Sequence, residues 1–198
     1  MSGTNIFPLP NRLKGPLRDA IVKNIFGKAK LLADVSRSER RIVLSPNPGV
    51  SLPYLVWSAG QREFVPLLLG LYWLMPPGAI SRRGTVKTVV LEEIEMGLHP
   101  QAISTLLALV LELLRRGYRV VMSTHSPHVL DLIWGVRFAQ QHGGDEADVL
   151  RMLDLPNNQE MRPVASSALK AALKVYFFQR DGIVKDISDL DPSSDDPA

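Results

Sequence analysis

Cysteine is absent from this chain of 198 residues, and so is any long apolar run. Without cysteine the fold can hold neither a disulfide framework nor a thiolate metal site. The longest apolar stretch, Phe64–Met75, is too short to span a bilayer and ends at Pro76-Pro77-Gly78. Met1–Pro10 contains two prolines and lacks the apolar segment of a secretory signal. We therefore expect a cytoplasmic protein with no membrane segment and with one compact core.

A strand–helix–strand unit is predicted between residues 88 and 123. Thr88–Leu91 is a continuous apolar run, which is typical of a strand covered on both faces in a parallel sheet. Gln101–Arg116 has apolar residues at helical spacing, with Pro100 suited to the first helical position. Tyr118–Ser123 gives a second strand. Because such crossovers make their two strands parallel, the pattern predicts an α/β fold, a parallel sheet flanked by helices.

Ionisable side chains follow both of these predicted strands. Glu92 and Glu93 come after the first strand, and His125 comes after the second. The carboxyl ends of parallel strands lie at one sheet edge, where open α/β sheets bind ligands. In phosphoryl transfer, one carboxylate can hold Mg²⁺ while the other orients or deprotonates the attacking water. The plainer alternative is an exposed glutamate pair and a hydrogen-bonded loop histidine.

Small residues precede a predicted helix at Ser58-Ala59-Gly60-Gln61. They allow close backbone approach, and the amino end of a helix favours anions. The plainer alternative is an ordinary N-cap, Ser58, in front of the helix Arg62–Met75.

A phosphate-binding loop of the form G-x-x-x-x-G-K-[ST] is missing from the sequence. The only Gly-Lys pair is Gly27-Lys28, which is followed by Ala29 and has Val22 in place of the first glycine. We expect the chain on its own to bind ATP poorly.

These motifs, in this order, resemble those of a known family. The run from Glu92 to Pro100, E-E-I-E-M-G-L-H-P, resembles the Walker B and D-loop segment of ABC-type ATPases outside the transporters. Those AAA-domain proteins are related to the overcoming-lysogenization-defect nucleases and, more distantly, to structural-maintenance-of-chromosomes proteins. Their segment reads E-E-P-E-x-x-L-H-P, so Ile94 replaces a proline here. The Ser123–Pro127 run resembles the family's H-loop, and Ser58–Gln61 resembles its signature motif.

The resemblance implies a P-loop NTPase-like fold with an incomplete N-terminal lobe, and ATP and Mg²⁺ as cofactors. It implies that Glu92 is the acidic residue that holds Mg²⁺, that Glu93 is the general base, and that His125 is the γ-phosphate switch. It also implies that Ser58, Ala59, Gly60 and Gln61 contact ATP held by a partner subunit. The implied partner is a P-loop-bearing ATPase subunit or a second copy of the completed ATPase, with a nuclease or DNA-processing protein as a further option.

Charge and composition divide the chain into three parts. Residues 1–50 carry nine Lys or Arg against three acids, and Leu17–Leu32 has helical periodicity, which predicts a basic helical segment. Residues 51–185 form the predicted C-terminal lobe of the ATPase. Residues 186–198 contain five aspartates with proline and serine and are expected to be an acidic disordered tail.

Three further elements are predicted after Asp131. Val149–Leu155 is expected to be a strand and Ser166–Lys174 a short helix. Val175–Phe178 and Ile183-Val184 flank Asp181-Gly182 and predict a hairpin, because Asp-Gly is a strong turn signal.

Three functions remain open at this point. The first is ATP binding and hydrolysis by a completed ATPase, with the isolated chain inactive. The second is a non-catalytic module that docks on a complete ATPase and donates the signature motif. The third is DNA binding through the basic N-terminal segment, which requires a steep salt dependence of affinity.

Overall fold

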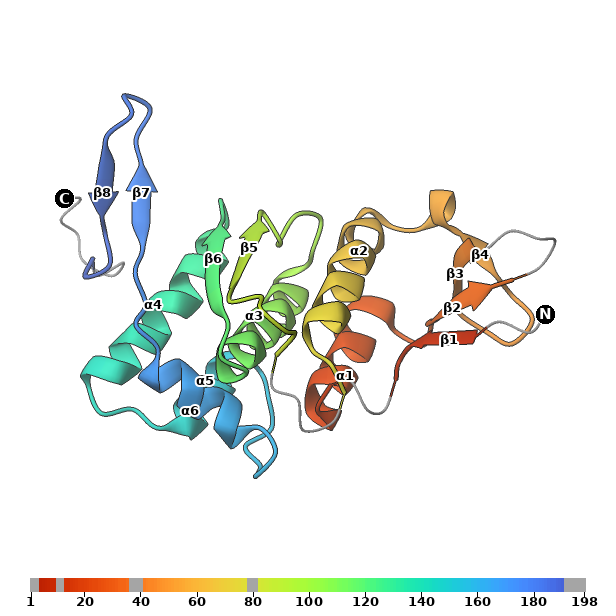
Figure 1. The fold of residues 1–198 in the computed structure, drawn as a ribbon, viewed down its shortest axis with the longest axis horizontal. Helices are drawn as coiled ribbons and strands as arrows, with labels where there is room; N and C mark the ends of the chain where they lie inside the picture. The colour runs from red at the N-terminus through yellow and green to blue at the C-terminus, as the bar shows by residue number, and fades with distance from the viewer. Residues whose placement is uncertain (1–3, 10–12, 36–40, 78–81, 191–198) are drawn as a thin grey trace.

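The computed structural model describes residues 4–9, 13–35, 41–77 and 82–190. Three sheets lie along its longest axis (Figure 1). An antiparallel sheet of β1 (Thr4–Phe7), β2 (Lys30–Asp34), β3 (Arg41–Ser45) and β4 (Leu52–Pro53) occupies one end, and a hairpin of β7 (Tyr176–Phe178) and β8 (Val184–Asp186) occupies the other. Between them lie the parallel strands β5 (Thr88–Glu92) and β6 (Arg119–Ser123). None of the described helices has the length and apolar character needed to cross a bilayer.

The centre of the fold is the predicted strand–helix–strand unit. β5 and β6 pair in parallel, with Thr88 opposite Arg119 and Glu92 opposite Ser123. They are joined through α3 (Pro100–Arg115), which begins at Pro100 as predicted. Every residue of α3 from Ala102 to Leu113 is buried, as expected for a helix enclosed on all sides. The α/β character and the parallel pair are therefore confirmed.

The N-terminal segment is less helical than predicted. The helix α1 (Gly15–Ile21) continues into a π-helical turn, η1 (Val22–Phe26), and stops at Gly27, whose φ is +59°. The chain then enters β2, so the predicted helix Leu17–Leu32 is wrong in its second half. Glycine tolerates this left-handed conformation and ends the helix.

Aromatic side chains join this N-terminal region to the rest of the core. Phe7 of β1 lies 5.1 Å from Phe26 of η1 and 6.1 Å from Tyr72, measured between ring centroids. Phe26 lies 5.9 Å from Phe64. Tyr72 and Phe64 belong to α2 (Ala59–Leu74), which confirms the helix predicted after Ser58. A single buried cluster therefore spans the chain from Phe7 to Ala168.

The C-terminal part contains three helices before the hairpin, namely α4 (Pro127–Gln141), α5 (Glu146–Met152) and α6 (Arg162–Lys170). The strand predicted at Val149–Leu155 is wrong, because these residues lie mostly in α5. Asp145 caps that helix by accepting hydrogen bonds from the backbone N–H groups of Ala147 and Asp148. The predicted hairpin is confirmed, and Asp186 belongs to β8 rather than to the tail. Residues 191–198 of the predicted tail lie outside the described residues.

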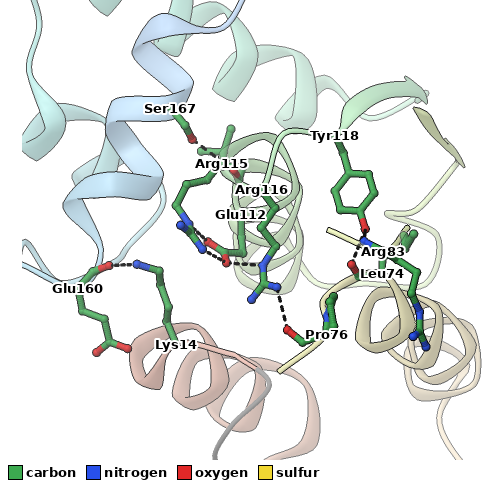
Figure 2. Close-up of polar contacts among 11 residues, drawn as sticks. Lys14, Leu74, Pro76, Arg83, Glu112, Arg115, Arg116, Tyr118, Glu160 and Ser167 are labelled. Atoms are coloured by element: carbon green, nitrogen blue, oxygen red, sulfur yellow. Dashed lines mark hydrogen bonds and ion pairs between the residues drawn. The ribbon is translucent and has the colours of Figure 1, made fainter. Parts of the chain in front are cut away.

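A buried charge cluster ties α3 to its neighbours (Figure 2). The Glu112 side chain is 1% exposed and binds Arg115 and Arg116, with a shortest N–O distance of 2.6 Å to Arg115 and of 2.8 Å to Arg116. Arg116 also donates to the carbonyl oxygen of Pro76, after the end of α2. Burial by itself raises the pKa of the Glu112 carboxyl, but hydrogen bonds from the two arginines outweigh it and hold the pKa below its ordinary value.

One face of the parallel pair is open. Alternate residues of β5 are exposed, and Val90 and Val121 show 64% and 52% of their surfaces to solvent. Parallel sheets are normally covered on both faces. The prediction that this chain covers both faces of Thr88–Leu91 is therefore wrong, because its own helices cover only the side that Val89 and Leu91 face.

Candidate nucleotide site

The three predicted site residues Glu92, Glu93 and His125 come together at the carboxyl edge of the parallel pair. Glu92 is the last residue of β5 and lies opposite Ser123 of β6. The backbone N–H of Glu93 donates to the Ser123 carbonyl oxygen over 3.1 Å. The Nε2 atom of His125 lies 3.2 Å from Oε1 of Glu93, and the histidine side chain is 87% exposed. A solvent-facing carboxylate–imidazole pair therefore stands beside Glu92.

Glu93 has an unusual backbone conformation, with a φ of +44°. Residues other than glycine rarely adopt it, and it costs on the order of 1–3 kcal/mol. The turn is held by the bond from the Glu93 N–H to Ser123 and by a second bond from the Met96 N–H to the Glu93 carbonyl oxygen. This strained turn directs the chain away from β5 immediately after Glu92, and such strain is typical of functional sites.

Glu95 is a site residue that the motif analysis did not single out. Its Oε1 accepts hydrogen bonds from the Thr124 hydroxyl over 2.5 Å and from the His125 backbone N–H over 3.0 Å. Burial alone raises the pKa of the Glu95 carboxyl, but the bond from Thr124 and the backbone amides outweigh it, so the pKa lies below its ordinary value. Its other oxygen, Oε2, is shielded from solvent and has no hydrogen-bond partner among the described residues. Glu95 thus fixes the loop that carries His125.

Ser58 and Gln61 form a reciprocal capping box at the start of α2. The Ser58 hydroxyl accepts from the Gln61 N–H over 3.2 Å, and Gln61 Oε1 accepts from the Ser58 N–H over 3.1 Å. The plainer interpretation of this motif as a helix start is therefore correct as local structure. The box leaves the Ser58 hydroxyl proton free to be donated elsewhere.

The turn at Gly60 lies directly against the turn after the glutamates. A Cβ atom on Gly60 would come within 2.5 Å of the Gly97 carbonyl oxygen. Gly97 has a φ of +69°, and a Cβ there would lie 3.2 Å from the Gly60 nitrogen. The opposing backbone thus excludes a side chain at Gly60, and at Gly97 the tight contact and the positive φ both disfavour one. Ser58–Gln61 and the run from Glu92 to Pro100, far apart in sequence, form one continuous surface.

The residues present suit a hydrated cation better than an enclosed one. Among the described residues, no three His, Asp or Glu side chains converge as a metal site. Mg²⁺ usually keeps several waters and takes one or two carboxylates together with substrate phosphates. The exposed Glu92 carboxylate fits that arrangement when phosphates supply the remaining oxygens. His128 does not belong to this site. Its Nε2 lies within hydrogen-bonding distance, 3.1 Å, of the hydroxyl of Ser104 in α3.

Comparison with protein families bears on residues 3–131, which cover the strained turn, the capping box and His125. They match the family model described as "AAA domain, putative AbiEii toxin, Type IV TA system". The chain belongs to this AAA-domain family. The match extends over more than half of the sequence and assigns the α/β fold of P-loop NTPases. Searches of curated proteins and of solved structures give no significant match.

Membership of this AAA family indicates a nucleotide-binding, ATPase-like function and a nucleotide such as ATP as ligand. Of the predicted site residues, the structure brings Glu92, Glu93 and His125 to one sheet edge and places Gly60 against Gly97. Glu95 belongs to the run that carries the resemblance, but the sequence assigned it no role, because that role depends on a contact with Thr124, which lies 29 positions further along the chain.

Proposed function

We propose that this AAA domain forms the C-terminal half of an ABC-type ATP-hydrolysing site. The observation that carries the proposal is the pairing of His125 with Glu93 beside Glu92, at adjacent carboxyl ends of parallel strands. Open α/β sheets bind their ligands at this edge. The phosphate-binding loop comes from another chain or from a segment outside this sequence, because no G-x-x-x-x-G-K-[ST] motif is present.

The roles follow from the chemistry of each side chain. Glu92 would hold the hydrated Mg²⁺ that accompanies ATP, which would supply neutralisation of charge on the phosphates. Glu93 accepts a proton from the attacking water or orients it. His125, whose Nε2 lies 3.2 Å from Oε1 of Glu93, would contact the terminal phosphate of a bound nucleotide. Glu95 keeps the His125 loop in place through Thr124.

The second half of the proposal concerns Ser58–Gln61 as a signature motif. Its backbone surface is continuous with that of Gly97, so both turns can meet the same opposing subunit. Small residues at the start of α2 let a phosphate approach the backbone amides closely. We place ATP of a partner subunit against this surface.

The decisive experiment measures ATP hydrolysis by the chain together with a protein that supplies the phosphate-binding loop. Glu93→Gln should lower the rate by about 10²–10⁴-fold, since the amide keeps the shape but cannot accept a proton. ATP binding should persist. Glu146→Gln, in the first turn of α5, is the matched control and should hydrolyse ATP at the wild-type rate.

An unchanged rate with Glu93→Gln would remove the catalytic role. It would favour the alternative function, a non-catalytic module that docks on a complete ATPase.

A further inference from the structure

Four basic side chains lie together at the amino end of the parallel pair, opposite the edge that carries the proposed ATP site. Three are in the loop that leads into β5 and one is the first residue of β6, namely Arg82, Arg83, Lys87 and Arg119. All four are at least partly exposed. No described carboxylate forms an ion pair with any of them. This end of the pair therefore carries a positive charge that no described side chain neutralises.

Hydrogen bonds to the backbone hold the two parts of this basic cluster together. The Arg119 N–H donates to the Lys87 carbonyl oxygen over 2.8 Å. The Arg82 guanidinium donates over 3.3 Å to the carbonyl oxygen of Gly117, two residues before Arg119. The loop before β5 thus lies along the start of β6, and the four charges form one cluster. Arginine and lysine side chains carry several N–H donors each, so donors remain for an acceptor from outside.

An exposed tryptophan lies beside the basic cluster. The guanidinium carbon of Arg83 lies 5.0 Å from the ring centroid of Trp73, near the C-terminal end of α2. Trp73 is 51% exposed, so part of its ring is accessible to a ligand. The buried Tyr118 fixes this arrangement, because its hydroxyl donates to the Leu74 carbonyl oxygen over 2.5 Å and accepts from the Arg83 N–H over 2.6 Å (Figure 2). The aromatic ring and the cations therefore belong to one fixed surface.

We propose that this surface binds a single-stranded nucleic acid, with one base stacked on Trp73 and the neighbouring phosphates on the basic cluster. Stacking of bases on aromatic rings and contacts of phosphates with Lys and Arg are the two components of such binding. A duplex keeps its bases paired and stacked on one another, so it cannot use the Trp73 ring. An acidic peptide would neutralise the cations, but its carboxylates would leave the ring without a partner.

The surface is separate from the proposed ATP site. The parallel strands run from Thr88 and Arg119 at this end to Glu92 and Ser123 at the other. The two ends lie about 13 Å apart along the strands, so a nucleic acid bound here leaves the carboxyl edge free. Binding can therefore be measured without ATP, and its outcome is independent of the proposed hydrolysis.

The basic cluster is tested with the full chain and a short labelled oligothymidylate, whose binding is followed by fluorescence anisotropy at several salt concentrations. Contacts with four phosphates predict a slope of about −2.8 for the logarithm of the association constant against that of the salt concentration, since each phosphate of a single strand contributes about −0.7. Lys87→Ala combined with Arg119→Ala should change the slope to about −1.4. Lys28→Ala combined with Lys30→Ala removes the same charge from exposed positions of the N-terminal segment and should leave the slope unchanged.

The stacked base is tested by Trp73→Ala. Loss of stacking with one base should weaken binding by about 5- to 150-fold and leave the salt slope nearly unchanged. The intrinsic fluorescence of the chain gives a second measurement. Of the three tryptophans, Trp57 is buried and the indole nitrogen of Trp134 is shielded from solvent. The oligothymidylate should therefore quench mainly the emission of Trp73, and the quenching should disappear in the variant.

Several outcomes would overturn the proposal. They are a lack of binding at low salt, equal affinity for a duplex of the same length, and displacement by polyglutamate as effective as that by unlabelled oligothymidylate. Wild-type affinity of Trp73→Ala would show that no base stacks on the ring. An equal change of slope in the two double variants would show that binding follows the general positive charge of the chain and not this cluster.

Discussion

Replacement of Glu95 by alanine should loosen the loop that carries His125. The change removes the acceptor of two hydrogen bonds, from the Thr124 hydroxyl and from the His125 N–H. Hydrogen bonds to a charged group contribute about 1.5–3 kcal/mol each. The His125 amide lies at the surface and can donate to water when Glu95 is removed. We therefore expect the free energy of unfolding to fall by about 2 kcal/mol, which is less than the sum of the two hydrogen bonds.

The loss is measured by urea or thermal unfolding. For a chain of this size, about 2 kcal/mol lowers the melting temperature by roughly 4–8 °C. Glu95→Gln keeps the shape and one acceptor oxygen and should cost about half as much. Glu63→Ala, an exposed change within α2, is the control and should leave stability nearly unchanged.

Hydrogen exchange locates the effect. The His125 amide should exchange faster in Glu95→Ala, while the amides of α3 stay protected. If Glu95→Ala unfolds like Glu63→Ala and the His125 amide exchanges at the wild-type rate, the bonds contribute nothing and Glu95 does not hold the loop.

Three further outcomes are expected. First, isothermal titration of the chain alone with ATP and Mg²⁺ should show binding weaker than micromolar, because most phosphate contacts are absent; micromolar affinity would contradict the half-site. Second, Ser58→Arg should prevent the ATP-dependent association of the completed ATPase, because it places a bulky side chain at the surface shared with Gly97. Light scattering measures the association, and the lost cap should cost only about 0.5–2 kcal/mol of stability. A variant that still associates and hydrolyses ATP normally would reduce Ser58–Gln61 to a plain helix start. Third, Glu112→Gln should lower the free energy of unfolding at pH 7 by about 3–5 kcal/mol, because it leaves two arginines without their buried partner. Since the folded pKa of Glu112 lies below that of the unfolded chain, this contribution is complete above the unfolded value of about 4.3 and disappears as the pH falls through the folded pKa. Urea unfolding of wild type and variant across that range checks it, and a difference that persists unchanged in strong acid would refute the reasoning.

The central unit of the fold could be predicted because its sequence pattern is long and local. α3 has apolar residues at helical spacing over four turns, with Pro100 at its start, and it lies between two short apolar runs. The same pattern brought Glu92, Glu93 and His125 to one edge, since parallel strands align their carboxyl ends.

The errors arose where short segments depend on distant contacts. Val149–Leu155 is a short apolar run, and runs of this length occur in both strands and helices. The helix forms here because Asp145 caps its amino end. Leu17–Leu32 has one periodicity, but Gly27 divides it into a helix and a strand. The open sheet face and the contact of Glu95 with Thr124 depend on tertiary structure, which composition and spacing do not contain.

The backbone contact between Gly60 and Gly97 limits how the protein can be redesigned or can drift in sequence. A Cβ at position 60 would meet the carbonyl oxygen at 2.5 Å, and residue 97 has a φ that disfavours other residues. Position 60 cannot accept a larger residue, and no change of side chain at position 97 relieves that clash, because the obstacle is a main-chain carbonyl oxygen. The two turns can therefore be transplanted into another scaffold only as a pair.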